Sequence, residues 1–217
     1  MKQPKIIINC AMSADGKIAS ASGKQVRISS EEDMKRVYQL RHSVDAVLVG
    51  INTVLNDDPK LTVKKKYVST PHQPIRIVLD AQCRTPQNAL IVNNKAKTII
   101  IKDEQVTCSK TFHNNVSIVS VPAEKGKVHL NYVLDHLSTL GISSILVEGG
   151  GTVIWNFIKH RLVDELYVFI GSMIIGGKQT PTMTMGKGFE NENDFIRLHC
   201  VDFRQLGDGL LLHYRLK

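Results

Sequence analysis

The stretch Ile145-Leu146-Val147-Glu148-Gly149-Gly150-Gly151-Thr152 runs from an apolar, strand-like segment into three glycines, and a helical pattern follows at 153–160. Glycines carry no side chain, so backbone N–H groups can approach an anion closely, and a helix N-terminus adds about half a positive charge. The stretch therefore predicts a strand, a phosphate-binding turn and a helix in succession. A tight turn between strand and helix that binds nothing is the alternative interpretation.

The chain lacks the best-known signatures of several other chemistries. Its glycines match neither G-x-G-x-x-G nor G-x-x-x-x-G-K-[ST]. The eight histidines are scattered without metal-binding spacing, and there is no G-x-S-x-G elbow and no H-x-E with P-C-x-x-C zinc site. Hydrolysis and zinc deamination are therefore disfavoured, and we expect no metal.

Short apolar runs alternate with helical patterns along most of the chain, which is typical of an α/β fold. Near the C-terminus the glycines of Gln205-Leu206-Gly207-Asp208-Gly209 suit a hairpin turn instead. We predict a largely parallel central sheet flanked by helices, a C-terminal antiparallel hairpin, and a long loop at 171–193. The expected strands are 5–8, 45–49, 75–79, 98–101, 117–121, 144–147, 165–170, 197–204 and 210–216, and the expected helices are a segment capped by Ser29 or Ser30, 130–140 and 153–160.

Length and composition describe an ordinary globular chain of 217 residues and 24.2 kDa, with 42% hydrophobic and 22% charged residues. We expect a single domain over 1–217, since domains commonly have ~100–200 residues. The net charge of +8 suits an anionic partner, such as a phosphorylated metabolite, a dinucleotide or a nucleic acid. A solvated surface rich in lysine is the alternative explanation of this charge.

The four cysteines, Cys10, Cys83, Cys108 and Cys200, form no Cys-x-x-Cys pair. We expect all four to be reduced and mostly buried thiols. No apolar run approaches the ~18–20 residues that span a bilayer, and the first residues lead directly into a strand-like run. These features predict a cytoplasmic protein with no membrane partner.

Two further predicted strands end in small or polar residues. Gly50 follows an apolar run, and Thr53 and Asp57, four residues apart, fit one side of a short helix that Pro59 ends. The loop at 9–17 contains small residues and an Asp-Gly turn signal. Because the carboxyl ends of parallel strands meet at one edge of a sheet, we expect these loops and the glycine turn to converge on a ligand.

Several of these segments occur in an order that is more specific than any one of them: Met12–Ala19, Ile28–Asp33, Leu40-Arg41, Asp45–Gly50 with Thr53, Asp57–Thr62, Val78–Asp80, Leu146–Thr152, Val163–Glu165 and Gly176-Gly177. The ordered set resembles the riboflavin-biosynthesis reductase family, in its stand-alone archaeal form. The resemblance covers essentially the whole chain.

The resemblance implies a dihydrofolate-reductase-like fold and a homodimer, with NADPH laid across the carboxyl edge of the sheet and NADH left possible. It also implies the reaction, in which a hydride reaches C1′ of a ribosylaminopyrimidine 5′-phosphate and the sugar opens to a ribityl chain. Bifunctional relatives add an N-terminal zinc deaminase. Since this chain lacks the zinc signature, we expect it to reduce only.

The resemblance also implies roles for individual residues. Asp57 and Glu148 are the implied catalytic residues, Asp57 as candidate proton donor and Glu148 as hydrogen-bond acceptor for the donor-rich pyrimidine. Lys64 stands where many relatives carry arginine, which leaves the anchor of the substrate phosphate open. The implied cofactor contacts are Thr53, Asp57, Ala81, Gly150, Gly151 and Thr152, and the implied substrate contacts are Asn9, Ser13, Arg41, Leu61, Lys64 and Glu148.

The sequence is also compatible with two other functions. A pteridine or folate-type reductase on the same fold would share most of these features. A nucleic-acid-binding protein is suggested only by the positive charge, because the aromatic residues do not alternate with basic ones and no binding motif is found. We therefore expect a small phosphorylated substrate and no nucleic acid.

Overall fold

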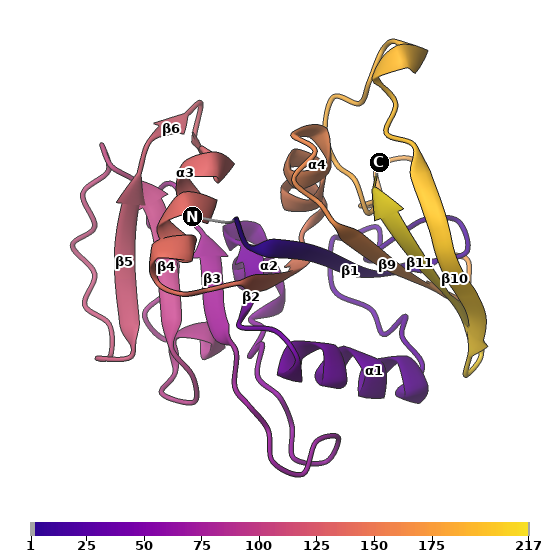
Figure 1. Cartoon of the computed structure of the whole chain (residues 1–217), viewed down its shortest axis with the longest axis horizontal. Helices are drawn as coiled ribbons and strands as arrows, with labels where there is room; N and C mark the ends of the chain where they lie inside the picture. Colours follow the sequence, from indigo (N-terminus) through magenta and orange to yellow (C-terminus); the bar gives the residue numbers. More distant parts are fainter. Residues whose placement is uncertain (1–2, 217) are drawn as a thin grey trace. The chain divides into compact units, whose positions relative to one another are not determined.

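A computed structural model describes residues 3–216, in which strands alternate with helices over part of the chain and follow one another directly from β4 to β7 and from β10 to β11 (Figure 1). The strands are β1 (Lys5–Ser13), β2 (Ala46–Gly50), β3 (Ile75–Leu79), β4 (Thr98–Asp103), β5 (Val116–Val121), β6 (Ala123–Glu124), β7 (Lys127–Val128), β8 (Ser144–Gly149), β9 (Glu165–Gly171), β10 (Leu198–Leu206) and β11 (Gly209–Leu216). The α-helices are α1 (Glu31–His42), α2 (Ile51–Asp57), α3 (Leu130–Thr139) and α4 (Gly151–Lys159). Two 3-10 helices are η1 (Leu90–Val92) and η2 (Glu192–Asp194).

Local sequence explains where several helices begin and end. Ser30 precedes α1, and its hydroxyl oxygen accepts a hydrogen bond from the N–H of Asp33 at 3.1 Å, as expected of an N-cap. Acidic side chains lie in the first turn of α1 and basic ones in its last turn, so both complement the helix dipole. α3 ends before Gly141, whose φ of +78° is a conformation that glycine adopts without strain.

The chain divides into two compact units. Unit 1 comprises the chain up to Lys5 and Tyr38–Leu146, and unit 2 comprises Ile6–Val37 and the chain from Val147 on. β8 begins in unit 1 and ends in unit 2, and α1 begins in unit 2 and ends in unit 1. The expectation of a single domain over 1–217 stays a prediction.

Unit 1 contains four parallel strands in the order β2-β3-β4-β5, and β3, β4 and β5 lie side by side in Figure 1. All five residues of β2 are buried. Arg76 in β3 is also fully buried, and its guanidinium donates to the carbonyl oxygens of Asn93 at 2.6 Å and Ala96 at 2.7 Å. Burial lowers the pKa of Arg76 to about 10, so the guanidinium remains charged at neutral pH while it holds the segment before β4.

Unit 2 contains parallel and antiparallel pairs. β9 pairs in parallel with β1 and antiparallel with β11, which in turn pairs antiparallel with β10. β10 is the edge strand, and eight of its nine residues are exposed. The predicted C-terminal hairpin is therefore present, and it forms the edge of the sheet in this unit.

The predicted α/β architecture is confirmed in the described residues, with a largely parallel sheet, a C-terminal antiparallel hairpin and each expected strand and helix. β1 differs most, because it was predicted over 5–8 and extends to Ser13, pairing with β9 as far as Gly171. The β6–β7 hairpin and both 3-10 helices were not predicted. No helix in the described part of the chain is long and apolar enough to cross a membrane.

Candidate functional site

The implied site residues fall into two groups, one in each compact unit. That both groups serve one ligand stays a prediction. Unit 1 contains Arg41, Thr53, Asp57, Leu61, Lys64 and Ala81, and unit 2 contains Asn9, Ser13, Glu148, Gly150, Gly151 and Thr152.

The three glycines in unit 2 end β8 and begin α4, directly after the half-buried Glu148. Gly149 has a φ of +117°, which residues with side chains disfavour, and Gly150 precedes α4 without a side-chain hydrogen bond to the helix end. The first N–H groups of a helix have no partner within the helix. The turn therefore fits the oxygens of a phosphate or pyrophosphate group, and Thr152 is exposed in the first turn of α4.

Gly151 is required by close packing. A Cβ atom added to it would lie 2.5 Å from the backbone oxygen of Thr182, and the N–H of Met185 donates to the Gly151 oxygen at 3.1 Å. Further along α4, the ring of Trp155 contacts that of Phe189, with 4.8 Å between the ring centroids. The loop after β9 thus packs along the start of α4, and a larger residue at Gly151 would displace it.

A carboxylate holds the loop that follows β1. Asp15 accepts hydrogen bonds from the hydroxyl of Ser13 at 2.6 Å and from the N–H groups of Ile175 at 3.0 Å and Gly176 at 2.7 Å. These bonds, that of Ser13 most strongly, lower the pKa of Asp15 to about 2. Ser13 is fully buried and its hydroxyl also accepts from the N–H of Lys17, so the structure gives Ser13 a loop-fixing role. Its predicted substrate contact stays a prediction.

Asn9 lies in β1 and is buried, and its side-chain oxygen accepts a hydrogen bond from Arg36 in α1 at 2.6 Å. Arg36 was not predicted as a site residue. Its spacing of three residues from Asp33 is typical of an ion pair within a helix. No local pattern relates Arg36 to Asn9, which is 27 positions away.

In unit 1, Arg41 and Lys64 share one aromatic ring. The guanidinium carbon of Arg41 lies 5.3 Å, and Nζ of Lys64 5.4 Å, from the centroid of the Tyr38 ring. The ring of Tyr67 stacks on that of Tyr38, with 4.7 Å between the ring centroids, and Nζ of Lys66 lies 4.9 Å from the Tyr67 ring centroid. These five residues form a tyrosine–cation cluster that concentrates positive charge and suits a phosphate. The tyrosines were not predicted as functional.

α2 carries Thr53 and, one turn later, Asp57. Asp57 is half-buried, and burial raises its pKa, so its carboxyl keeps a proton closer to neutral pH than an exposed one. The next residue, Asp58, ends the helix with a φ of +41°, and its carboxylate accepts from the N–H of Leu90 at 2.7 Å. The two adjacent carboxylates therefore have separate surroundings. Leu61, a few residues on, is buried.

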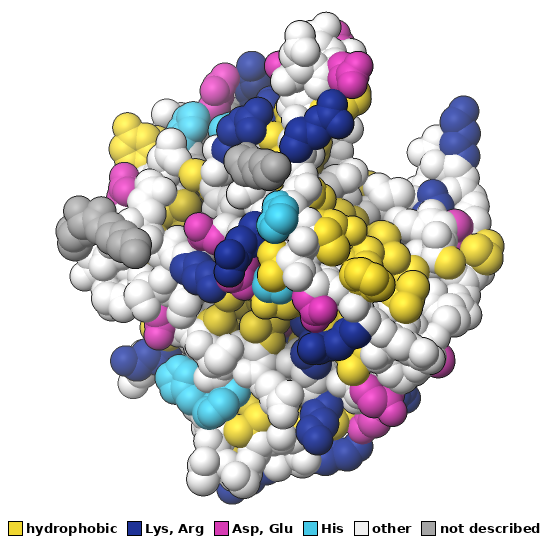
Figure 2. All heavy atoms as spheres, turned by 45° about the vertical axis from the view of Figure 1, so that its right-hand side comes forward, with side chains coloured by type: hydrophobic (Ala, Val, Ile, Leu, Met, Phe, Trp, Pro, Cys, Tyr) yellow, Lys and Arg dark blue, Asp and Glu magenta, His cyan; other side chains and the backbone are white. Residues whose placement is uncertain are grey.

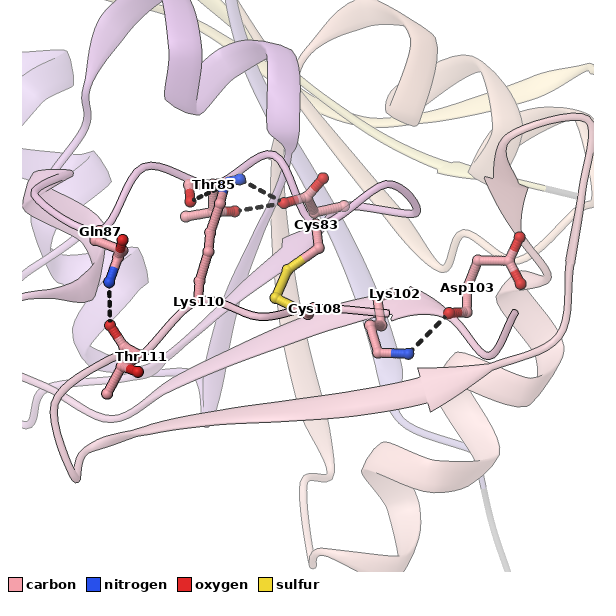
Figure 3. The surroundings of a disulfide bond; sticks show 9 residues. Cys83, Thr85, Gln87, Lys102, Asp103, Cys108, Lys110 and Thr111 are labelled. Atoms are coloured by element: carbon pink, nitrogen blue, oxygen red, sulfur yellow. Dashed lines mark hydrogen bonds between the residues drawn. A yellow bond between two sulfur atoms is a disulfide. The ribbon is translucent and has the colours of Figure 1, made fainter. Parts of the chain in front are cut away.

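Ala81 is buried in the turn after β3. The carboxylate of Asp80 accepts hydrogen bonds from the N–H and the hydroxyl of Thr85, both at 2.7 Å. Lys110 Nζ donates to the carbonyl oxygen of Thr85 at 2.9 Å. These bonds hold the turn that carries Ala81 and tie it to the segment at 106–110 (Figure 3).

A disulfide joins Cys83 to Cys108, whose Cα atoms lie 5.8 Å apart (Figure 3). The expectation that all four cysteines are reduced is therefore wrong for this pair. A separation of 25 positions gives no local sign that the two segments meet. Cys10 is a buried thiol, and burial raises its pKa to about 12, whereas Cys200 is an exposed thiol.

The described part of the chain contains no set of metal ligands. Among residues 3–216, no group of three His, Cys, Asp or Glu side chains could hold a metal ion.

Residues 4–212 match the model of the RibD C-terminal domain, and the chain belongs to that family. Acinetobacter baumannii RibD (form 2) has a TM-score of 0.85 at 25% identity, over 99% of this chain and 58% of that chain. The yeast reductase Rib7 shares the fold with a TM-score of 0.75 at 20% identity, over 99% of this chain and 90% of that one. The dihydrofolate-reductase-like fold class is thereby confirmed.

Two archaeal proteins are similar over nearly their whole length. The chain is 38% identical over 215 residues to 2,5-diamino-6-ribosylamino-4(3H)-pyrimidinone 5′-phosphate reductase of Methanothermobacter thermautotrophicus, covering 99% of both. It is 40% identical over 221 residues to the protein of the same name from Archaeoglobus fulgidus, covering 98% of both. The resemblance to the stand-alone archaeal form is thus confirmed.

Proposed function

We propose that this chain reduces 2,5-diamino-6-ribosylamino-4(3H)-pyrimidinone 5′-phosphate in riboflavin biosynthesis, with NADPH as reductant and the ribitylamino compound as product. The observation that carries the proposal is the identity of 38% and 40% to two archaeal reductases of that name over at least 98% of each chain. This similarity spans both compact units, and so both groups of implied site residues.

The glycine turn is the proposed site of the cofactor pyrophosphate. Gly150, Gly151 and Thr152 would hold it, because the start of α4 has no side-chain cap and helix N-termini favour anions. Thr53 and Ala81 are the proposed further contacts in unit 1. Bound NADPH supplies the hydride, and the residues of the chain bind and orient.

Two features suit the proposed substrate. The carboxylate of Glu148 would accept hydrogen bonds from the amino groups of the pyrimidine. Arg41 and Lys64 of the tyrosine–cation cluster would hold the 5′-phosphate, Lys64 as a point charge and Arg41 with its fork of donors.

Asp57 is the proposed proton donor. Reduction of C1′ with opening of the sugar adds one hydride to carbon and one proton to the ring oxygen, which becomes a hydroxyl. Burial raises the pKa of Asp57, which favours a carboxyl that still has its proton. Holding the reacting atoms about 3–3.5 Å apart can contribute roughly 7–11 kcal/mol of the rate enhancement, so positioning is the larger task of this site.

Incubation of the purified chain with NADPH and each candidate substrate tests the proposal. We expect NADPH oxidation with the pyrimidinone phosphate, and none with dihydrofolate or an oxidised pterin. Oxidation with dihydrofolate or the pterin alone would instead support the pteridine or folate-type alternative. NADH in place of NADPH measures the cofactor preference in the same assay.

Single substitutions separate the proposed roles. We expect Glu148→Gln to raise the substrate KM more than it changes NADPH affinity in calorimetry, and a defect confined to NADPH binding would contradict this role.

Asp57→Asn should lower kcat by about 10²–10⁴-fold, the usual contribution of a general acid. Asp58→Asn is the matched control, because it alters the neighbouring carboxylate that contacts Leu90 and should leave kcat within about threefold.

We also propose that the chain forms a homodimer through β10. Unpaired edge strands readily pair with another chain, and β10 exposes Phe203 at 72% and Val201 at 40%. In an antiparallel pair of β10 strands centred on Phe203, Asp202 of one copy would lie opposite Arg204 of the other. Figure 2 turns the side of the hairpin forward and shows a hydrophobic patch there among Lys and Arg side chains. The proposal predicts a concentration-dependent sedimentation coefficient.

A further inference from the structure

Arg36 in α1 and Asn9 in β1 form a buried pair in unit 2. Arg36 Nη2 donates to Asn9 Oδ1 at 2.6 Å, Asn9 is 8% exposed, and the Arg36 side chain is 14% exposed. We infer that Arg36 is a positioning residue, which fixes the orientation of the Asn9 carboxamide so that its Nδ2 donates to the carbonyl oxygen of the substrate pyrimidinone. This inference rests on the proposed function, through the substrate role of Asn9.

Arg36 is itself held in place from two sides. Asp33, whose side chain is 1% exposed, accepts at Oδ1 from Arg36 Nε at 2.8 Å and lies 2.7 Å from Nη2. The guanidinium carbon also lies 5.7 Å from the ring centroid of Tyr167. The Tyr167 ring in turn stacks on that of His213, with 4.2 Å between the two centroids. Because the guanidinium is planar and its Nε and Nη2 are both engaged, the direction of the bond to Asn9 is fixed.

A hydrogen-bond donor in a fixed position determines the orientation of a neighbouring carboxamide. The side chain of asparagine has two orientations related by a half-turn, which exchange its oxygen acceptor and its nitrogen donor. Arg36 has only donors, so the orientation with Oδ1 toward Arg36 is favoured and the opposite one brings two donors together. Residues 3–216 give the Asn9 side chain this single hydrogen bond, which leaves Nδ2 as the group that it offers to a ligand.

A neutral amide donor matches a ring carbonyl better than it matches a phosphate. Hydrogen bonds between buried neutral groups select for shape and for the donor–acceptor pattern, while a dianion is bound more strongly by charged donors. Arg41 and Lys64 already provide such charges in unit 1. The carbonyl of the pyrimidinone is therefore the acceptor to which we assign Asn9 Nδ2.

Two substitutions of Arg36 test the inference in the full chain. We expect Arg36→Met to raise the substrate KM about tenfold, the factor that corresponds to 1.4 kcal/mol, with the Kd for NADPH changed less than twofold. Arg36→Lys keeps the charge near Asp33 but lacks the second nitrogen of the fork, so it should raise KM similarly while it remains folded by circular dichroism. Arg27→Met is the matched control, since Arg27 is exposed and pairs only with exposed Glu31 among the described residues.

A double-mutant cycle distinguishes positioning from a general structural role. If Arg36 acts through Asn9, Arg36→Met has no further effect on KM in the Asn9→Ala background, although each single variant raises it. Additive increases in KM, or a fall in kcat and NADPH affinity together with unchanged KM, would overturn the inference.

Ribose 5-phosphate, which has the sugar phosphate but no pyrimidinone, separates the two possible acceptors. We expect its inhibition constant to be the same for the wild type and Arg36→Met. An equal weakening of substrate and ribose 5-phosphate binding would assign Asn9 to the phosphate and overturn the assignment to the carbonyl. A wild-type chain that does not reduce the pyrimidinone phosphate would overturn the proposed function and this inference with it. If the wild type is active and the effects of Arg36→Met and Asn9→Ala on KM are additive, this inference alone is overturned.

Discussion

β2 in unit 1 and β10 in unit 2 have the same kind of backbone and opposite surroundings. All five residues of β2 are buried, whereas eight of nine in β10 are exposed, including Phe203 at 72%. β2 is an uninterrupted run of small and apolar residues, while β10 places Val201 and Phe203 on either side of Asp202. An unbroken apolar run thus predicts a central strand, and apolar residues mixed with charged ones mark an edge that can take a partner.

The largest effect is expected inside the buried strand. Leu48→Ala should lower the free energy of unfolding by about 4 kcal/mol, because Leu48 is fully buried and leaves a cavity that its neighbours fill only in part. Val201→Ala in β10 is the matched control and should change the free energy of unfolding of the monomer by less than about 0.5 kcal/mol. Urea denaturation of both variants measures the difference. Equal losses would mean that the two strands do not differ in burial in solution.

The disulfide should have the next largest effect. Closing a loop of 25 positions stabilises a protein by roughly 3 kcal/mol, so replacing Cys83 and Cys108 by serine should lower the Tm by about 6–12 °C. Cys200→Ser, at an exposed thiol, is the control and should leave the Tm unchanged. Alkylation of the unreduced, denatured chain should label two cysteines. Labelling of all four would contradict the disulfide.

The Tm at low pH should show how much the Asp15 carboxylate stabilises the loops of unit 2. The pKa of Asp15 is about 2 in the folded chain and about 3.9 in an unfolded one, so its stabilisation is complete above pH ~4 and is lost as the pH falls toward 2. Asp15→Asn should therefore lower the Tm at pH 6 and flatten its fall between pH 4 and 2. Asp135→Asn, at an exposed position of α3, is the control. An unchanged acid slope in Asp15→Asn would exclude this role.

The smallest effect on stability is expected at the edge strand. Phe203→Ser should change the free energy of unfolding of the monomer by less than about 0.5 kcal/mol, because Phe203 is exposed. It should nevertheless shift sedimentation toward the monomer at all concentrations. Tyr132→Ser, at an aromatic residue that is 57% exposed on α3, is the control and should leave sedimentation unchanged. A wild-type chain that sediments as a monomer throughout would contradict pairing through β10.

Several elements were predictable because their signals are local. β3 was expected over 75–79 and has those bounds, since four of its five residues are apolar and Asp80 follows them. The helix after the three glycines was equally accessible, because glycines and apolar spacing lie next to each other in the chain. β1 was predicted too short, because its second half depends on pairing with β9, which no local pattern reveals.

The candidate site was predictable as two sets of residues and not as an arrangement of contacts. Resemblance selected Arg41 and Lys64, but the ring of Tyr38 that they share emerges only in three dimensions. Ser13 was selected as a ligand contact, and the structure shows that its hydroxyl proton is used by Asp15. Surrounding atoms decide which side-chain groups remain available, and a linear motif does not contain them.

The succession of strands and helices, the glycine turn and the family could be predicted from the amino-acid sequence, because periodicity, turn residues and motif order are properties of neighbouring positions. The bond between Cys83 and Cys108 and the contact between Arg36 and Asn9 are visible only in the folded chain. These contacts join positions 25 and 27 residues apart, and packing of the chain brings them within bonding distance.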